Sequence, residues 1–244
     1  MPLVDLGDVT IHCEEAGSGS MAFVHCHGLG QNGDGFIPEL AFWASHFGRA
    51  ITWDNRGLGR SSTARKYSLP LYALDLARLL DRLGVRKAVV HGVSWGGVVA
   101  QQFAIDHLDK CAAVIIDSGS SEVNLAASER WYAIGESAKK GEAFSRAVKP
   151  EHVESFVASA RAVAALREHP LTPRLKSVTC PVLVIAGAKD EVTAGTIGPS
   201  IIAKHLPNAE LVILPDAGHA VYNHAPAQFR DAVLAFCRKH GLIR

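Results

Sequence analysis

Gly92-Val93-Ser94-Trp95-Gly96 lies between an apolar run at 87–93, which predicts a strand, and a helical pattern at 96–107. A serine on a sharp turn between a strand and a helix has a strained backbone and an exposed hydroxyl group. We expect both glycines to be required, because a side chain at Gly92 or Gly96 would collide with the neighbouring strand or helix. The segment therefore indicates that Ser94 is a nucleophile.

On both sides of this segment, apolar β-branched runs alternate with helical patterns, which predicts a parallel sheet covered on both faces. Strands are expected at 9–15 (an edge strand), 21–27, 50–54, 87–93, 112–117, 181–186 and 211–214, and helices at 37–47, 71–83, 96–107 and 227–240. Residues 119–170 show helical stretches and no convincing strand. We therefore expect an α/β fold: a doubly wound, mostly parallel core from residues 1–118 and 171–244, with a helical cap at 119–170.

The composition is that of an ordinary globular protein, with 48% apolar residues, 20% charged residues and a formal net charge of +1. This balance gives no electrostatic reason to expect nucleic acid or a membrane surface as partner. The N-terminal residues lack a secretory pattern, so we expect a cytoplasmic protein. The longest apolar runs are too short to span a bilayer, so we expect no membrane insertion. We further expect a monomer or homodimer. The five cysteines are scattered, which argues against a disulfide framework and against a zinc site.

A serine hydroxyl needs a base, and the base needs an orienting group, to act as a nucleophile near neutral pH. Asp190 and His219 each follow a predicted strand, and the chain order is serine, acid, histidine. Both lie on loops at the carboxyl ends of strands, where doubly wound sheets have their sites. We expect His219 to take the Ser94 proton and later return it, while Asp190 orients the imidazole and stabilises its charged form.

Other residues compete for these two roles. His224 lies five positions after His219 but lacks the glycine turn that precedes His219. Asp117 ends its own predicted strand, so it could act as the acid or could cap the turn at Ser118-Gly119. Asp216 is expected to shape the loop that carries His219.

The segment Gly28-Leu29-Gly30-Gln31-Asn32-Gly33 allows two interpretations. It has the spacing of a dinucleotide-binding loop, and Asp54 follows about twenty residues later, where a ribose-binding carboxylate belongs. That reading would indicate a nicotinamide- or flavin-dependent oxidoreductase. The polar run His25-Cys26-His27 and the position of Pro38 disfavour it, because the strand end is crowded and the helix start is delayed.

In a hydrolase the same loop supplies part of an oxyanion hole, which needs two backbone N–H groups aimed at one point near the nucleophile. The N–H groups of Leu29 and Trp95 are the candidates. A metal site at His25 and His27 lacks a third ligand at suitable spacing, so we expect no metal and no other cofactor.

Taken together, these motifs resemble those of the α/β-hydrolase superfamily over nearly the whole chain. His27-Gly28-Leu29-Gly30 is similar to its oxyanion loop, Asp54-Asn55-Arg56-Gly57-Leu58-Gly59-Arg60-Ser61-Ser62 to its Asp-x-Arg-Gly-x-Gly-x-Ser turn, and the segment from Gly92 to Gly97 to its nucleophile elbow. The likeness is greatest to small esterases and enol-lactonases that process aromatic breakdown products. It implies a serine hydrolase that cleaves a carboxylic ester or lactone of a small molecule through an acyl-enzyme. The cap is short, and Trp95 replaces the common Met or Leu.

The resemblance leaves other activities open. Carbon–carbon bond hydrolases, cofactor-free haloperoxidases and acyltransferases keep the same triad, and some members are ligand-sensing receptors with slow turnover. Members with an aspartate nucleophile do not match a serine at position 94. In the cap, Trp131 and Tyr132 are the candidate substrate-binding residues, although they could instead pack, with Phe144 and Phe156, in the core of a small helical unit.

Overall fold

The computed structural model describes residues 3–142, 148–193 and 198–243. Its strands are β1 (Leu3–Asp5), β2 (Thr10–Gly17), β3 (Met21–Cys26), β4 (Arg49–Trp53), β5 (Lys87–Val93), β6 (Cys111–Asp117), β7 (Val182–Gly187) and β8 (Ala209–Leu214). Its α-helices are α1 (Leu40–Phe47), α2 (Leu69–Arg82), α3 (Trp95–Asp106), α4 (Leu125–Lys140), α5 (Val153–Ala164), α6 (Pro199–His205), α7 (Val221–His224) and α8 (Pro226–Lys239).

The strands form one eight-stranded sheet in the order β1-β2-β4-β3-β5-β6-β7-β8. The pairs β1–β2 and β2–β4 are antiparallel, and the remaining pairs are parallel. This arrangement confirms the expected doubly wound, mostly parallel sheet. The strand expected at 9–15 is not at the edge, however, because β1 covers its outer side. A strand of three residues is too short to show a periodic pattern in the sequence.

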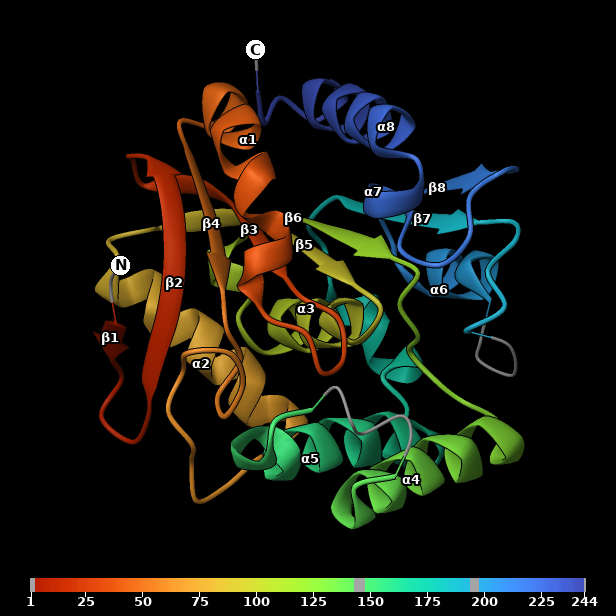
Figure 1. Ribbon diagram of the computed structural model, residues 1–244. Coiled ribbons are helices and arrows are strands. Elements are labelled where there is room, and N and C mark those ends of the chain that lie inside the picture. Colours follow the sequence, from red (N-terminus) through yellow and green to blue (C-terminus); the bar gives the residue numbers. More distant parts are fainter. Residues whose placement is uncertain (1–2, 143–147, 194–197, 244) are drawn as a thin grey trace.

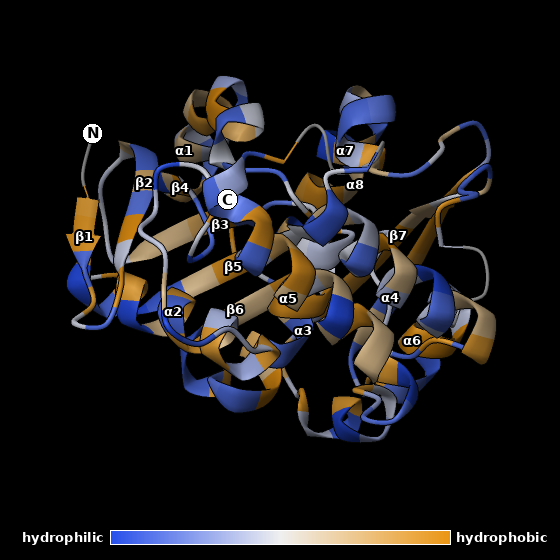
Figure 2. Cartoon of the chain, turned by 60° about the horizontal axis from the view of Figure 1, so that its bottom comes forward, coloured by the Kyte–Doolittle hydropathy of each residue, from blue (hydrophilic) through white to orange (hydrophobic). Residues whose placement is uncertain are grey.

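Alternate residues of the central strands enter two different cores. Val24 of β3 and Val90 of β5 join the core beneath α2 and α3, whereas Phe23 and Val89 join the core beneath α1 and α8. Figure 1 shows these helices on opposite faces of the sheet. Figure 2 shows the central strands β5 and β6 in apolar colours over much of their length. Mostly apolar strands are expected where both faces of a strand are buried.

Some helices differ from the expected ones. The segment expected as a helix at 37–47 forms a 3-10 helix, Gly33–Glu39, followed by α1. Asn32 caps the 3-10 helix by accepting a hydrogen bond from the Asp34 N–H. The short helices α6 and α7 were not expected. No helix among the described residues is long and apolar enough to cross a membrane.

Between β6 and β7 the chain forms α4 and α5, which pack side by side at one end of the molecule (Figure 1). Gly135 of α4 allows close contact with Val157 and Ala160 of α5. The pair has a small apolar cluster of its own, built from Ala138, Phe156 and Val157. We propose on this basis that residues 119–170 form the cap; Phe144 lies outside the described residues.

Candidate active site

Ser94 occupies the turn between β5 and α3 with φ 54° and ψ −115°, a backbone conformation that L-residues rarely adopt. The two flanking glycines make this turn possible. A Cβ atom on Gly92 would lie 2.1 Å from the Gly96 carbonyl oxygen, and one on Gly96 would lie 2.0 Å from the Cys26 carbonyl oxygen of β3. The predicted need for glycine at both positions is confirmed, because the backbone atoms beside each glycine leave no space for a methyl group.

The loop after β3 is shaped by His27. Its Nδ1 donates to the Gly28 carbonyl oxygen over 2.8 Å, and its Nε2 accepts the Asn55 N–H over 3.1 Å. This pair of bonds requires the neutral ring with its proton on Nδ1. Burial lowers the pKa of His27, against the opposing effects of the Gly28 carbonyl and Asp54, and so favours that neutral form.

The two expected oxyanion donors differ in their local structure. Trp95 is the first residue of α3, so its N–H has no acceptor within the helix. The N–H of Leu29 makes no hydrogen bond within the described part of the chain. Gly30 turns the loop with φ 70°, and a Cβ atom there would lie 2.8 Å from the Phe156 ring of α5.

Asp190 and His219 are in direct contact. Asp190 Oδ2 lies 2.9 Å from His219 Nδ1, and Asp190 Oδ1 accepts the N–H groups of Val192 and Thr193 over 2.9 and 3.2 Å. Burial alone would raise the pKa of Asp190, but the hydrogen bond and charge interaction with His219 outweigh it and lower that pKa. Asp190 is therefore a carboxylate at neutral pH, held in place on both oxygens.

Asp117, the alternative acid, has a different set of partners. Its Oδ1 accepts the Val221 N–H over 2.9 Å and the Ser118 hydroxyl over 3.0 Å, and its Oδ2 accepts the Tyr222 N–H over 3.0 Å. The side chain is fully buried. Its carboxylate binds the backbone just after His219, while the imidazole of His219 is bonded to Asp190.

The remaining competitors lie on the surface. His224 is exposed, and no carboxylate contacts its side chain within the described segments. Asp216 is also exposed and pairs with Lys189 Nζ over 2.8 Å. This ion pair links the loops that carry Asp190 and His219, which agrees with the expected shaping role of Asp216.

The contacts of Asp54 argue against the dinucleotide-binding interpretation. Its Oδ1 accepts the Gly33 N–H over 2.7 Å, and its Oδ2 accepts the Arg60 N–H over 2.8 Å. His12 Nδ1 lies 3.1 Å from the same Oδ2, and the Asp54 side chain is fully buried. Both carboxylate oxygens are therefore occupied by the protein itself, and neither is exposed to bind a ribose.

His25, the other part of the rejected metal pair, faces a different environment from His27. Its Nδ1 lies 3.1 Å from Nδ1 of His91, and its ring stacks on Phe36 at a centroid distance of 4.0 Å. Burial, and then the neighbouring His91 and His27, hold the pKa of His25 well below its usual range. The histidine is therefore a neutral core residue.

Ser94 lines a small cavity of about 20 Å³. The apolar side chains around it are Leu29, Trp95, Val98, Trp131, Val163 and Val192. Trp131 is thus placed beside the predicted nucleophile. Tyr132, the other expected substrate contact, is 51% exposed and has the Arg161 guanidinium 5.4 Å from its ring centre.

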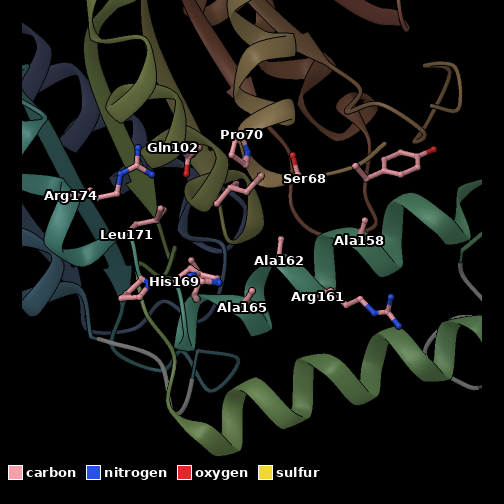
Figure 3. A pocket seen from close by; sticks show the side chains of 14 residues that line it. Ser68, Pro70, Gln102, Ala158, Arg161, Ala162, Ala165, His169, Leu171 and Arg174 are labelled. Atoms are coloured by element: carbon pink, nitrogen blue, oxygen red, sulfur yellow. The ribbon is translucent and has the colours of Figure 1, made fainter. Parts of the chain in front are cut away.

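A larger cavity, of about 750 Å³, lies between α5 and the start of α2 (Figure 3). Ala158 and Ala162 of α5 line it, together with Ala165 directly after this helix, whereas Val163 of α5 lines the Ser94 cavity. None of the predicted site residues borders the larger cavity. Its two arginines are already paired, Arg161 with Glu136 and Arg174 with Asp106.

Two sets of contacts at the site, those of Asp117 and those of His27, were not predicted from the sequence. The Asp117 carboxylate binds backbone groups 104 and 105 positions away, which no local motif announces. The His27 contacts have a weak signal, since this histidine directly precedes the glycine loop that it shapes.

Comparison with known proteins gives one family match: the model described as "Alpha/beta hydrolase family" matches residues 23–232. Among curated proteins, the 3-oxoadipate enol-lactonase 2 of Acinetobacter baylyi is 27% identical over 89% of each chain. Among solved structures, the enol-lactonase from Burkholderia xenovorans LB400 has a TM-score of 0.86 at 20% identity, covering 97% of this chain and 100% of that one. A thermophilic esterase from Thermogutta terrifontis has a TM-score of 0.82 at 24% identity, covering 96% and 95%. At these identities the two structures support the fold alone.

Proposed function

The chain belongs to the alpha/beta hydrolase family, and on this premise we propose that it hydrolyses a carboxylic ester or lactone of a small molecule, with Ser94 as nucleophile. The observation that carries the proposal is the 2.9 Å contact between Asp190 and His219. It supplies an oriented base, and the loop that bears this base is bonded to Asp117, whose carbonyl also receives the Ser94 N–H.

In the proposed mechanism, Asp190 keeps the proton of neutral His219 on Nδ1 and leaves Nε2 free to accept a proton. Ser94 Oγ attacks the substrate carbonyl carbon as its proton passes to His219. The N–H groups of Leu29 and Trp95 stabilise the resulting oxyanion. His219 then protonates the leaving alkoxide, and an acyl-enzyme forms. Water, activated by His219, hydrolyses this intermediate and restores the Ser94 hydroxyl group.

The lining of the Ser94 cavity favours an apolar acyl group, because its walls include Trp131, Val163 and Val192. An ester and a lactone undergo the same acyl transfer; in a lactone the leaving hydroxyl simply stays attached to the acyl group. The name of the related 3-oxoadipate enol-lactonase 2 of Acinetobacter baylyi agrees with this chemistry.

The test is a panel of short p-nitrophenyl esters and small lactones, assayed with the wild type and with Ser94→Ala. We expect the substitution to lower kcat/KM by roughly 10³-fold or more, because only binding and the oxyanion donors remain. Ser120→Ala is the matched control, since Ser120 lines the same cavity but has no place in the mechanism; its turnover should stay close to that of the wild type. Undiminished turnover by Ser94→Ala would contradict the proposal.

A fluorophosphonate probe gives a second measurement of the same proposal. It reacts with an activated serine, so it should label the wild type at Ser94 and leave Ser94→Ala unlabelled. Labelling at another serine would identify that residue, and not Ser94, as the nucleophile. A single slow turnover with every ester and lactone would favour a ligand-sensing role instead.

A further inference from the structure

We infer that Asp117 is a positioning residue that fixes the nucleophile turn and the histidine loop relative to each other; the inference rests on the function proposed above. Asp117 binds both segments at once. Its backbone carbonyl accepts the Ser94 N–H over 2.8 Å. Its carboxylate accepts the N–H groups of Val221 and Tyr222, two and three residues after His219, over 2.9 and 3.0 Å.

The next residue extends this connection to the acid. The Ser118 N–H donates to the Ile185 carbonyl of β7 over 3.0 Å, and β7 leads directly into the loop of Asp190. That loop begins with a turn in which the Asp190 N–H donates to the Gly187 carbonyl over 3.2 Å. The end of β6 thus contacts the segments that carry all three members of the proposed triad.

The histidine loop needs such an external contact. Ala220, directly after His219, has φ 61°, a left-handed conformation that is unfavourable for a residue with a Cβ atom. The helix α7 that follows is only four residues long, so few bonds of its own hold it. The buried Asp117 carboxylate bonds the first two N–H groups of this helix.

A carboxylate suits this position better than a neutral amide. It can accept on both oxygens, whereas an amide would place an NH2 group against one of the N–H donors. Hydrogen bonds to an ionised acceptor are also stronger than neutral ones. His91 is a titratable neighbour, but its Nε2 lies 3.8 Å from Asp117 Oδ2, which is beyond hydrogen-bond distance. The backbone amides and the Ser118 hydroxyl therefore hold the carboxylate.

The first experiment compares Asp117→Asn with Asp75→Asn, using p-nitrophenyl acetate and rates expressed per folded molecule. Asp75 is the matched control because it is also a fully buried carboxylate, but its partner is Arg56. We expect Asp117→Asn to lower kcat by about 10- to 100-fold with KM nearly unchanged, since a small misplacement of the base costs that much. Asp75→Asn should keep its kcat. Equal kcat values for Asp117→Asn and the wild type would overturn the inference.

The second experiment separates positioning from general damage. Asp117→Asn is also made in the His219→Ala background, where no imidazole remains to be positioned, and should then cause no further loss in the residual rate. The same fold-loss in both backgrounds would overturn the inference in favour of a structural role. If Asp117→Asn does not fold, Asp117→Ser replaces it in both comparisons. Full activity of His219→Ala and Ser94→Ala would instead refute the proposed function itself.

Discussion

Backbone strain is concentrated at the proposed site. Among the described residues, Ser94, Ser118 and Ala220 are the non-glycine residues with positive φ, at 54°, 53° and 61°. They are the proposed nucleophile, the residue after Asp117 and the residue after His219. Each conformation of this kind costs on the order of 1–3 kcal/mol and persists only where surrounding contacts impose it. The strain therefore indicates that the positions of these segments are maintained at a cost in folding stability.

At the same scale, Asp190→Asn tests the identity of the acid. An amide cannot hold the proton of neutral His219 on Nδ1 as a carboxylate does, so we expect kcat for short esters to fall by roughly 10⁴-fold. This loss should exceed that of Asp117→Asn, which changes only the position of the loop. Asp231→Asn is the control, because this exposed carboxylate of α8 takes no part in the proposed site, and it should leave kcat unchanged. A larger loss of kcat in Asp117→Asn than in Asp190→Asn would identify Asp117, the last residue of β6, as the acid.

At the scale of the elements, the buried strands were the most predictable part of the fold. The run expected at 87–93 is β5, and the strands expected at 50–54 and 112–117 differ from β4 and β6 by one residue at their ends. Strands buried on both faces are continuous apolar runs with clear limits. β1 and α7 were missed because each is short, and α7 is held by tertiary bonds to Asp117.

The candidate site was predictable to a similar degree. Ser94, Asp190 and His219 follow strands and could be proposed from their positions alone, because parallel strands bring their carboxyl ends to one edge of a sheet. The choice between Asp190 and Asp117 depends on which carboxylate reaches the imidazole. That depends on loop conformations, which the sequence pattern does not specify.

The glycines of two helices provide a matched stability prediction. Gly96→Ala should prevent folding or severely destabilise the protein, because its Cβ atom would lie 2.0 Å from the Cys26 carbonyl oxygen. Gly135→Ala should raise the free energy of unfolding by about 0.5–1 kcal/mol, since Gly135 lies inside α4 and its nearest neighbours would be 3.7 Å from the new methyl group. Urea denaturation measures both. Similar effects of the two substitutions would show that the close approach of α3 to β3 is not required.

At the scale of the whole molecule, the proposed cap and the core meet through buried hydroxyl groups. The Tyr72 hydroxyl of α2 lies 3.2 Å from both the Ser155 and the Ser159 hydroxyl oxygens of α5. Ser155 Oγ also donates to the Arg56 carbonyl oxygen over 2.7 Å. Next to Ser155, Phe156 packs against Gly30 in the proposed oxyanion loop. The position of α5 is therefore coupled to the loop that carries the Leu29 N–H.

Tyr72→Phe tests this coupling. It removes one hydroxyl from the buried cluster and leaves the Ser159 hydroxyl without this acceptor, so the free energy of unfolding in urea should fall by about 1–2 kcal/mol. Because α5 also lines the Ser94 cavity through Val163, kcat/KM for short esters should fall as well. Tyr132→Phe is the control: its hydroxyl is on an exposed ring, and its stability should change by less than about 0.5 kcal/mol. A loss of stability in Tyr72→Phe with unchanged kcat/KM would mean that these hydroxyl groups hold α5 in place without affecting the proposed oxyanion loop.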